Sequence, residues 1–238
     1  MAIVGRGKIR FYCKTMYRAT GRVVITGLLL CLASILPAIG QHRPTFLSQI
    51  NLAEQAFNDG DYAKAVGLAE SALKWNSVVD SGRISALDLI ARSQIAQAKY
   101  PEAKGTLKRS LDLISSAKLS QRQEAQTYLR LADLARSQRD FPKALREAKK
   151  GLEVAPHDKQ VQGEFYLGVG RIMFSAGYDL SAIVWLEKAE RIFASEPDST
   201  GQLDVYRFLS LAWSSKLNYP AALKCSEEFI SSSAGSRF

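Results

Sequence analysis

The stretch "NDGDYAKAVGLAESALKW", Asn58 to Trp75, decides the fold because it joins a turn signal to a helical pattern. The Asn, Asp and Gly at its start are residues that favour turns. After Tyr62, alanine or leucine recurs at three- and four-residue steps, which is the spacing of one face of an α-helix. The stretch therefore predicts the turn and the second helix of a helical hairpin.

The same pattern returns four more times along the chain. In three of these copies an aromatic residue again stands three residues before an alanine, while Tyr178 stands four residues before its alanine. The five alanines are Ala65, Ala103, Ala144, Ala182 and Ala222. Their spacings of 38, 41, 38 and 40 residues fall in the range that marks a repeat array. The sequence therefore predicts five hairpins.

A second set of positions supports the same register. Twelve positions before each alanine lies a small residue: Ala53, Ala91, Ala132, Gly170 and Ser210. A large aliphatic residue directly precedes each of them: Leu52, Ile90, Leu131, Val169 and Leu209. We expect the small residue and the alanine of one hairpin to face each other across a close crossing, and the aromatic residue to pack beneath the next hairpin. Because one hairpin cannot bury its own apolar face, the hairpins must stack.

These positions resemble the motif of the tetratricopeptide repeat (TPR) family, which has a small residue, a turn aromatic, an alanine three residues later and another small residue seven beyond. The last position reads Ala72, Ser110, Gly151, Ala189 and Phe229. Phe229 departs from the pattern, as does Asp179 at the aromatic position of the fourth copy. The resemblance covers about residues 45–231. It implies an all-α, right-handed superhelical solenoid of about five antiparallel helix-turn-helix repeats.

The expected repeats span about residues 46–80, 84–118, 125–158, 163–197 and 203–232, and we expect a flexible tail over 232–238.

Residues 1–40 have a different composition. Six Lys or Arg residues and no acid precede the uncharged run Val23–Leu36, which Pro37 and "AIG" (Ala38 to Gly40) follow. A basic start, an apolar core of this length and a small-residue site are typical of a secretory signal peptide. We expect cleavage after Gly40 and an exported protein, periplasmic or secreted.

Other interpretations of this segment remain open. One is an uncleaved single-pass inner-membrane anchor over Val23–Gly40, with its basic end inside and the repeats outside the cytoplasm. A mitochondrial presequence is disfavoured by the compact apolar core. Lipidation at Cys31 is disfavoured because two leucines precede it in the middle of the run.

The net charge reflects mainly this segment. Removing its six basic residues lowers the formal charge from +9 to +3, so the charge does not indicate nucleic-acid binding. The remaining chain keeps one cysteine, Cys225, and therefore has no internal disulfide.

The sequence shows little catalytic or cofactor chemistry. Its only histidines, His42 and His157, lie far apart and cannot form a zinc site with one cysteine. A nucleophile elbow, a phosphate loop and a metalloprotease motif are all missing. Gly168 and Gly170 lie within an expected first helix, where Gly170 fills the small packing position. We therefore expect no enzymatic activity, no cofactor and no metal.

The TPR resemblance implies that the first helices line a concave binding groove. Transferring the family's groove positions by spacing gives a peptide-binding set: Phe57, Arg92, Ile95, Arg136, Arg171, Phe174 and Arg207. Arginines and phenylalanines there suit a segment with acidic and apolar side chains. The alternative is that Asp88–Arg92, Asp133–Arg136 and Asp204–Arg207 are only ion pairs along helix surfaces.

The sequence thus predicts an exported, non-enzymatic TPR scaffold or adaptor that binds a protein or peptide. One alternative is a self-assembling or truncated repeat module of a larger envelope or regulatory protein, with homo-oligomers formed through the uncapped last repeat. An alternative from another class is an enzyme with an unrecognised site. Membrane association would occur through Val23–Gly40.

Overall fold

The computed structural model describes residues 45–75, 79–195 and 200–235. The signal or anchor segment expected at residues 1–40 lies outside them. Phe46–Phe238 forms one compact unit, and the fold described here is that of this unit.

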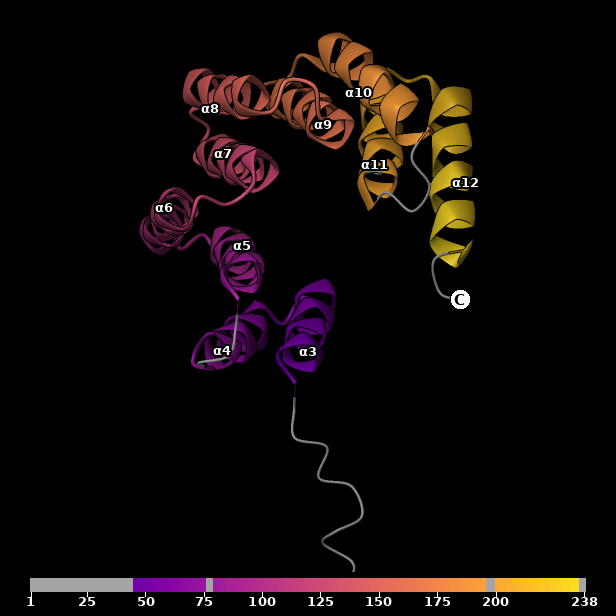
Figure 1. Ribbon diagram of the computed structural model, residues 1–238. Helices are drawn as coiled ribbons and strands as arrows, with labels where there is room; N and C mark the ends of the chain where they lie inside the picture. The colour runs from indigo at the N-terminus through magenta and orange to yellow at the C-terminus, as the bar shows by residue number, and fades with distance from the viewer. Residues whose placement is uncertain (1–44, 76–78, 196–199, 236–238) are drawn as a thin grey trace, which may run out of the picture. The chain divides into compact units, whose positions relative to one another are not determined.

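Ten α-helices follow one another in the described residues, with no strand among them (Figure 1). They are α3 (Phe46–Asn58), α4 (Tyr62–Leu73), α5 (Asp80–Ala96), α6 (Tyr100–Ala117), α7 (Gln121–Ser137), α8 (Phe141–Val154), α9 (Lys159–Ser175), α10 (Asp179–Phe193), α11 (Thr200–Ser215) and α12 (Tyr219–Gly235).

The helices pair into five hairpins that stack in chain order. Each odd-numbered helix packs against the helix that follows it, and each second helix packs against the first helix of the next hairpin. The first helices α3, α5, α7, α9 and α11 also contact one another in series. Among the described residues the second helices make no such contacts with one another. The first helices therefore form the inner layer of the stack, and the second helices form the outer layer.

Helix capping places several boundaries away from the expected ones. Ser120 and Asp158 accept backbone hydrogen bonds from Gln123 and Val161, so α7 and α9 begin four residues before the expected repeat starts. Counting from the packing motif misses these caps because the motif lies in the middle of each first helix. At the other end, α12 continues to Gly235, so residues 232–235 are helical rather than a flexible tail.

Four of the small positions are buried and Ser210 is half-buried, but their partners differ from those expected. Ala132 packs with Ala148, and Ala144 packs with Ala135 and with Ile172 of the next hairpin. In the fourth hairpin, a Cβ on Gly170 would lie 2.7 Å from Cγ of Leu186. The small residue therefore faces the position one helical turn beyond the alanine. Antiparallel helices pair residues equally distant from the turn, which puts partners here 16 residues apart rather than 12.

The turn aromatics join successive hairpins, as expected, at Tyr100 and Phe141. The hydroxyl of Tyr100 donates to the carbonyl oxygen of Ser137 at the end of α7, and Phe141 packs near Ile172 of α9. Asp179 holds the same position in the fourth hairpin without an aromatic ring. Its carboxylate instead pairs with Nζ of Lys216 at 3.6 Å, so an ion pair replaces the aromatic contact to the next hairpin.

Candidate binding face

One position on the inner layer carries charges of alternating sign. Directly after the small residue of each first helix stand, in chain order, Glu54, Arg92, Asp133, Arg171 and Leu211. Because successive first helices are in contact, these side chains lie at matching heights on neighbouring helices. The alternation therefore sets acid beside base from one hairpin to the next, until the last hairpin supplies leucine.

Two neighbouring pairs in this row bond directly. Nη1 of Arg92 donates to Oε1 of Glu54 at 3.0 Å, which joins α5 to α3. Nη2 of Arg171 lies 3.3 Å from Oδ1 of Asp133, which joins α9 to α7.

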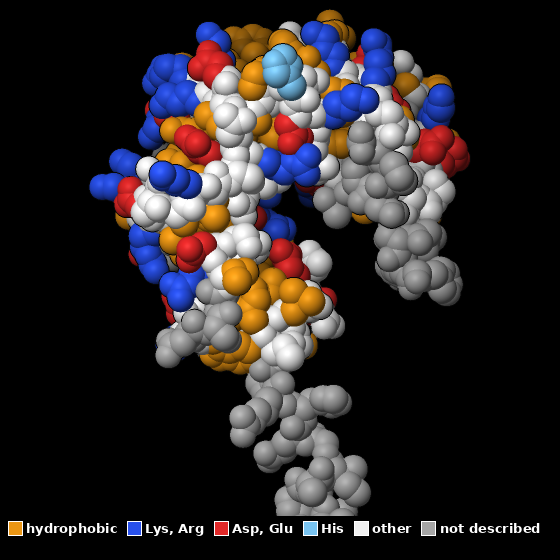
Figure 2. Space-filling view, viewed as in Figure 1, with side chains coloured by type: hydrophobic (Ala, Val, Ile, Leu, Met, Phe, Trp, Pro, Cys, Tyr) orange, Lys and Arg blue, Asp and Glu red, His pale blue; other side chains and the backbone are white. Residues whose placement is uncertain are grey.

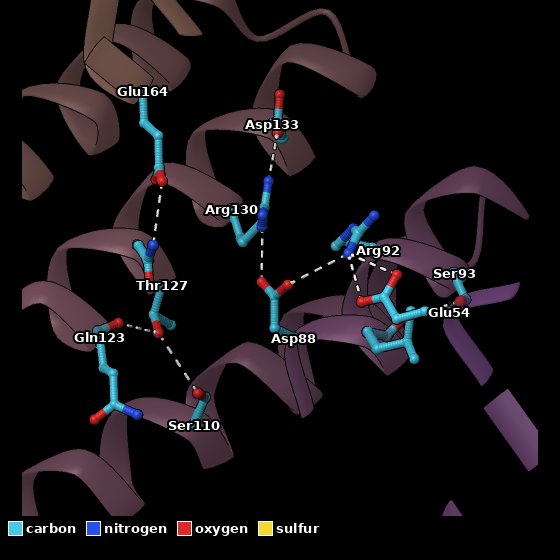
Figure 3. Close-up of polar contacts among 12 residues, drawn as sticks. Glu54, Asp88, Arg92, Ser93, Ser110, Gln123, Thr127, Arg130, Asp133 and Glu164 are labelled. Atoms are coloured by element: carbon cyan, nitrogen blue, oxygen red, sulfur yellow. Dashed lines mark hydrogen bonds and ion pairs between the residues drawn. The ribbon is translucent and has the colours of Figure 1, made fainter. Parts of the chain in front are cut away.

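The middle of the row is joined through two further residues. Asp88 lies 3.9 Å from Arg92 on its own helix, and its other oxygen accepts from Nε of Arg130 on α7 at 2.7 Å. Arg130 in turn lies 3.8 Å from Asp133 (Figure 3). We call the connected set the charge ladder: Glu54, Asp88, Arg92, Arg130, Asp133, Arg136 and Arg171. The ladder links four consecutive hairpins through side chains of their first helices.

Asp133 is the residue on which most of the ladder converges. Its side chain is only 17% exposed and lies within 4 Å of the guanidinium groups of Arg130, Arg136 and Arg171. Burial raises the pKa of Asp133, but Arg171, Arg136 and Arg130 together outweigh burial and hold that pKa below its usual range. One carboxylate therefore compensates three half-buried cations.

The two ladder arginines on α7, Arg130 and Arg136, differ in their surroundings. Asp88 above all, then Asp133 and Glu164, raise the pKa of Arg130 despite its burial. For Arg136 the direction is opposite, since burial and then the cations Arg171 and Arg207 lower its pKa against Asp133. Carboxylates thus dominate around Arg130, on the side of α5, whereas guanidinium groups of α9 and α11 lie near Arg136.

Aromatic rings accompany the arginines at both ends. The guanidinium carbon of Arg92 lies 4.3 Å from the ring centre of Phe57. On α11, the ring centre of Phe208 lies 5.3 Å from the guanidinium carbon of Arg171 and 4.8 Å from that of Arg207. Its ring also makes an edge contact with Phe174, with 6.1 Å between ring centres. Such cation–π contacts orient a guanidinium group without neutralising its charge.

The structure brings the predicted site residues together in two groups. Phe57 and Arg92 lie at the α3–α5 end, while Arg136, Arg171, Phe174 and Arg207 lie around α9 and α11. Ile95 joins neither group, because it packs with Ala103, Leu107 and Leu134 between the second and third hairpins.

The expected pairs within helices exist, and for Asp88 and Asp133 contacts between hairpins accompany them. Asp133–Arg136 and Asp204–Arg207 lie at 3.4 and 2.8 Å. Sequence reasoning missed Glu54, Arg130 and Phe208. The column directly after the small residue would have revealed Glu54, since it opens the alternation of sign.

The inner layer also has a polar depression of about 230 Å³ between α3, α5 and α7. Its lining is Glu54, Ile84, Ser85, Asp88, Gln123, Gln126, Thr127 and Arg130. Amide and carboxylate groups there can accept or donate hydrogen bonds to an extended backbone. Elsewhere on the surface, Lys and Arg side chains lie among Asp and Glu side chains across the face that Figure 2 shows.

The described residues contain no group of three or more His, Cys, Asp or Glu that could hold a metal ion. A search of the same residues for a helix long and apolar enough to cross a membrane finds none. Burial, and then Glu190, raises the pKa of Cys225, which disfavours the thiolate that a nucleophile needs.

Solved structures with this arrangement are TPR-like repeat proteins. A Rap protein complexed with Competence and Sporulation Factor superimposes with a TM-score of 0.67 at 17% identity, covering 79% of this chain and 54% of that one. A thermophilic TPR protein of Thermus thermophilus gives a TM-score of 0.55 at 20% identity, covering 79% and 91%. The fold is a TPR-like helical solenoid. This confirms the all-α repeat architecture that the sequence predicts.

A STAND signal-transduction ATPase with a TPR sensor, from Pyrococcus horikoshii, matches with a TM-score of 0.55 at 18% identity, over 78% of this chain and 29% of that one. The chain thus spans about half of the Rap protein and less than a third of the ATPase. No family model matches the sequence, and no curated protein matches it.

Proposed function

We propose that the chain is an exported, non-enzymatic TPR-like scaffold that binds a protein or peptide segment on its inner layer. The observation that carries the proposal is a continuous surface formed by five first helices, with arginines, aromatic rings and a polar depression along it. Extended surfaces of this kind suit elongated partners. In the Rap structure, a protein with this fold is complexed with Competence and Sporulation Factor.

Site-specific photo-crosslinking tests where the partner binds. A photoreactive amino acid replaces Ser85 or Ser214, which are exposed on the first helices α5 and α11, in the whole chain expressed in its source cells. Matched positions on the second helices are Lys108 and Lys149, which are also exposed. Crosslinks to one partner from the first pair only support the inner layer. Crosslinks from the second pair only contradict it.

Export is the second part of the proposal, and it depends on the composition of residues 1–40. A reporter that is active only outside the cytoplasm, fused after Phe238, is expected to be active. Mass spectrometry is expected to find a mature chain starting at Gln41. An inactive reporter contradicts export, whereas an active reporter on a full-length, membrane-bound chain selects the anchor over Val23–Gly40.

Self-association is a second candidate function, favoured by exposed apolar residues on the last hairpin. Tyr219, Leu223 and Ile230 of α12 are each more than 60% exposed. At the position of Leu223, the earlier second helices α4 and α10 carry Val66 and Ile183, which belong to clusters with the next hairpin. If copies associate through this face, Leu223→Ser with Ile230→Ser is expected to convert an oligomer into a monomer in sedimentation experiments.

A further inference from the structure

The two ends of the inner layer differ in how completely their cations are compensated. Arg92 and Arg130 bond to Glu54 and Asp88, and Arg92 is only 27% exposed. At the other end, Arg136 and Arg171 both depend on Asp133, and Arg207 bonds to Asp204 on its own helix. The α9–α11 end therefore holds more positive charge than its own carboxylates compensate.

The last position of the alternating row carries no charge. Leu211 stands where the alternation would place an acid beside Arg171, and it is 47% exposed. The Nε–H of Arg171 has no hydrogen-bond acceptor among the described residues, although it is buried. The side chain of Arg207 is 51% exposed. Two contacts are thus missing at the same place: an acidic acceptor for the arginines, and an apolar side chain against the exposed Leu211.

We propose that the α9–α11 end of the inner layer, with Arg207, Phe208 and Leu211 on one face of α11, binds an acidic side chain and a neighbouring apolar side chain of an extended protein segment. This inference rests on the proposed function and names the part of the inner layer that recognises the partner. Residues at positions 207, 208 and 211 share a helix face, so a carboxylate on Arg207 brings its neighbour onto Phe208 and Leu211. A carboxylate can form two parallel hydrogen bonds with a guanidinium group.

The small number of accessible cations selects this partner over a polyanion. Arg136 and Arg171 are each less than 20% exposed, so Arg207 is the exposed arginine of the group. Nucleic acids gain affinity from many phosphate contacts, which one exposed arginine cannot supply. One or two carboxylates beside an apolar residue match this surface better.

Defined peptides test the proposal with the whole chain. The probe is the fluorescein-labelled peptide GSDLFDLSGS with an amidated C-terminus, and its neutral analogue is GSNLFNLSGS, also amidated. Fluorescence anisotropy is expected to give a Kd about tenfold lower for the acidic peptide, because hydrogen bonds to charged groups are stronger than neutral ones. The neutral peptide with an unblocked C-terminus distinguishes a terminal carboxylate from an acidic side chain.

Two variants and two matched controls locate the binding. Arg207→Gln is expected to erase the tenfold difference between the peptides, and Leu211→Ser is expected to weaken both. The controls Arg146→Gln on α8 and Leu180→Ser on α10 change exposed residues of the same types and are expected to leave both Kd values unchanged. All four positions are exposed, so helical circular dichroism should be unchanged and should confirm that each variant is folded.

The outcomes separate this inference from the proposed function. The inference about α11 is overturned if the Arg207→Gln variant binds both peptides as the parent does. It is also overturned if only the peptide with the unblocked C-terminus binds, or if neither amidated peptide binds. In each case, crosslinks from Ser85 and Ser214 would still support an inner-layer scaffold with a partner of other chemistry. Crosslinks only from the second helices would remove the proposed function itself.

Discussion

The inner layer from α3 to α9 and its end at α11 are built on the same repeat but hold their charges differently. From α3 to α9, acids and arginines of neighbouring hairpins bond to one another, so these charges hold the stack together. On α11, Asp204 and Arg207 bond to each other within the helix, and the position in the alternating row is Leu211. The same position of the repeat therefore carries ion pairs between hairpins in the first four hairpins and an exposed apolar side chain in the last.

The largest effect is expected where two hairpins cover the same alanine. Ala144→Arg places a long cation among Ala135 and Ile172 at a fully buried site, and should destabilise the protein by about 3 kcal/mol or more. Ala222→Arg changes the matching residue of the last hairpin, which no described hairpin covers. There the arginine can extend toward solvent, so we expect a clearly smaller loss. Urea unfolding of both variants measures the difference, and equal losses would show that the last hairpin is packed like the others.

The carboxylate shared by three arginines should matter more than the one paired on α11. Asp133→Asn leaves Arg130, Arg136 and Arg171 without their common partner, and should cost about 2–3 kcal/mol. Asp204→Asn removes an exposed pair within one helix, and should cost less than about 1 kcal/mol. The free energy of unfolding at pH 7 checks both values. Similar losses of unfolding free energy for the two variants would mean that the ladder stabilises the protein no more than ordinary surface ion pairs do.

The same comparison has a pH dependence with a defined sign. The folded-state pKa of Asp133 lies below its ordinary value, so its contribution to stability is present above the unfolded pKa of about 4. That contribution is lost as the pH falls through the folded-state pKa. The difference in unfolding free energy between the parent and Asp133→Asn should therefore narrow steadily below about pH 4. A difference that stays constant down to pH 2 would show that folding does not lower the pKa of Asp133.

The sequence predicts the hairpins better than the contacts of their charges. Turn residues, small residues and aromatic residues recur with a visible period, and they are enough to predict five stacked hairpins. Helix periodicity pairs charges within one helix, where Asp133 and Arg136 are three residues apart. Their partners in other hairpins lie a whole repeat away, as Arg171 lies 38 residues from Asp133. Comparing the same position across repeats reveals such pairs, whereas helix periodicity alone does not.

Burial explains the remaining differences between sequence and structure. Ile95 occupies a groove position by spacing, yet it packs between hairpins because neighbouring aliphatic side chains cover it. The exposure of Leu211 likewise depends on what lies beside α11 in space, and no local pattern encodes that.

The smallest change in stability is expected from extending the ladder by one position. Leu211→Glu places a carboxylate on α11 beside Arg171, as Asp133 on α7 and Glu54 on α3 lie beside Arg171 and Arg92. Because the new pair is partly exposed, the gain in stability should be only about 0.5 kcal/mol. Leu211→Gln has nearly the same size without the charge, and therefore isolates the ion pair.

Leu211→Glu should change stability and binding in opposite directions. If the α11 end recognises an acidic segment, the Leu211→Glu carboxylate occupies Arg171 and repels the partner, so the acidic peptide should lose at least about tenfold in affinity while the protein gains stability. Melting temperature and peptide anisotropy, measured on the same samples with Leu211→Gln beside them, report the two effects separately. A gain in stability without a loss of binding would support the ion pair with Arg171 and would contradict a binding site on α11. A loss of stability would show that positions directly after the small residue do not meet between the fourth and fifth hairpins.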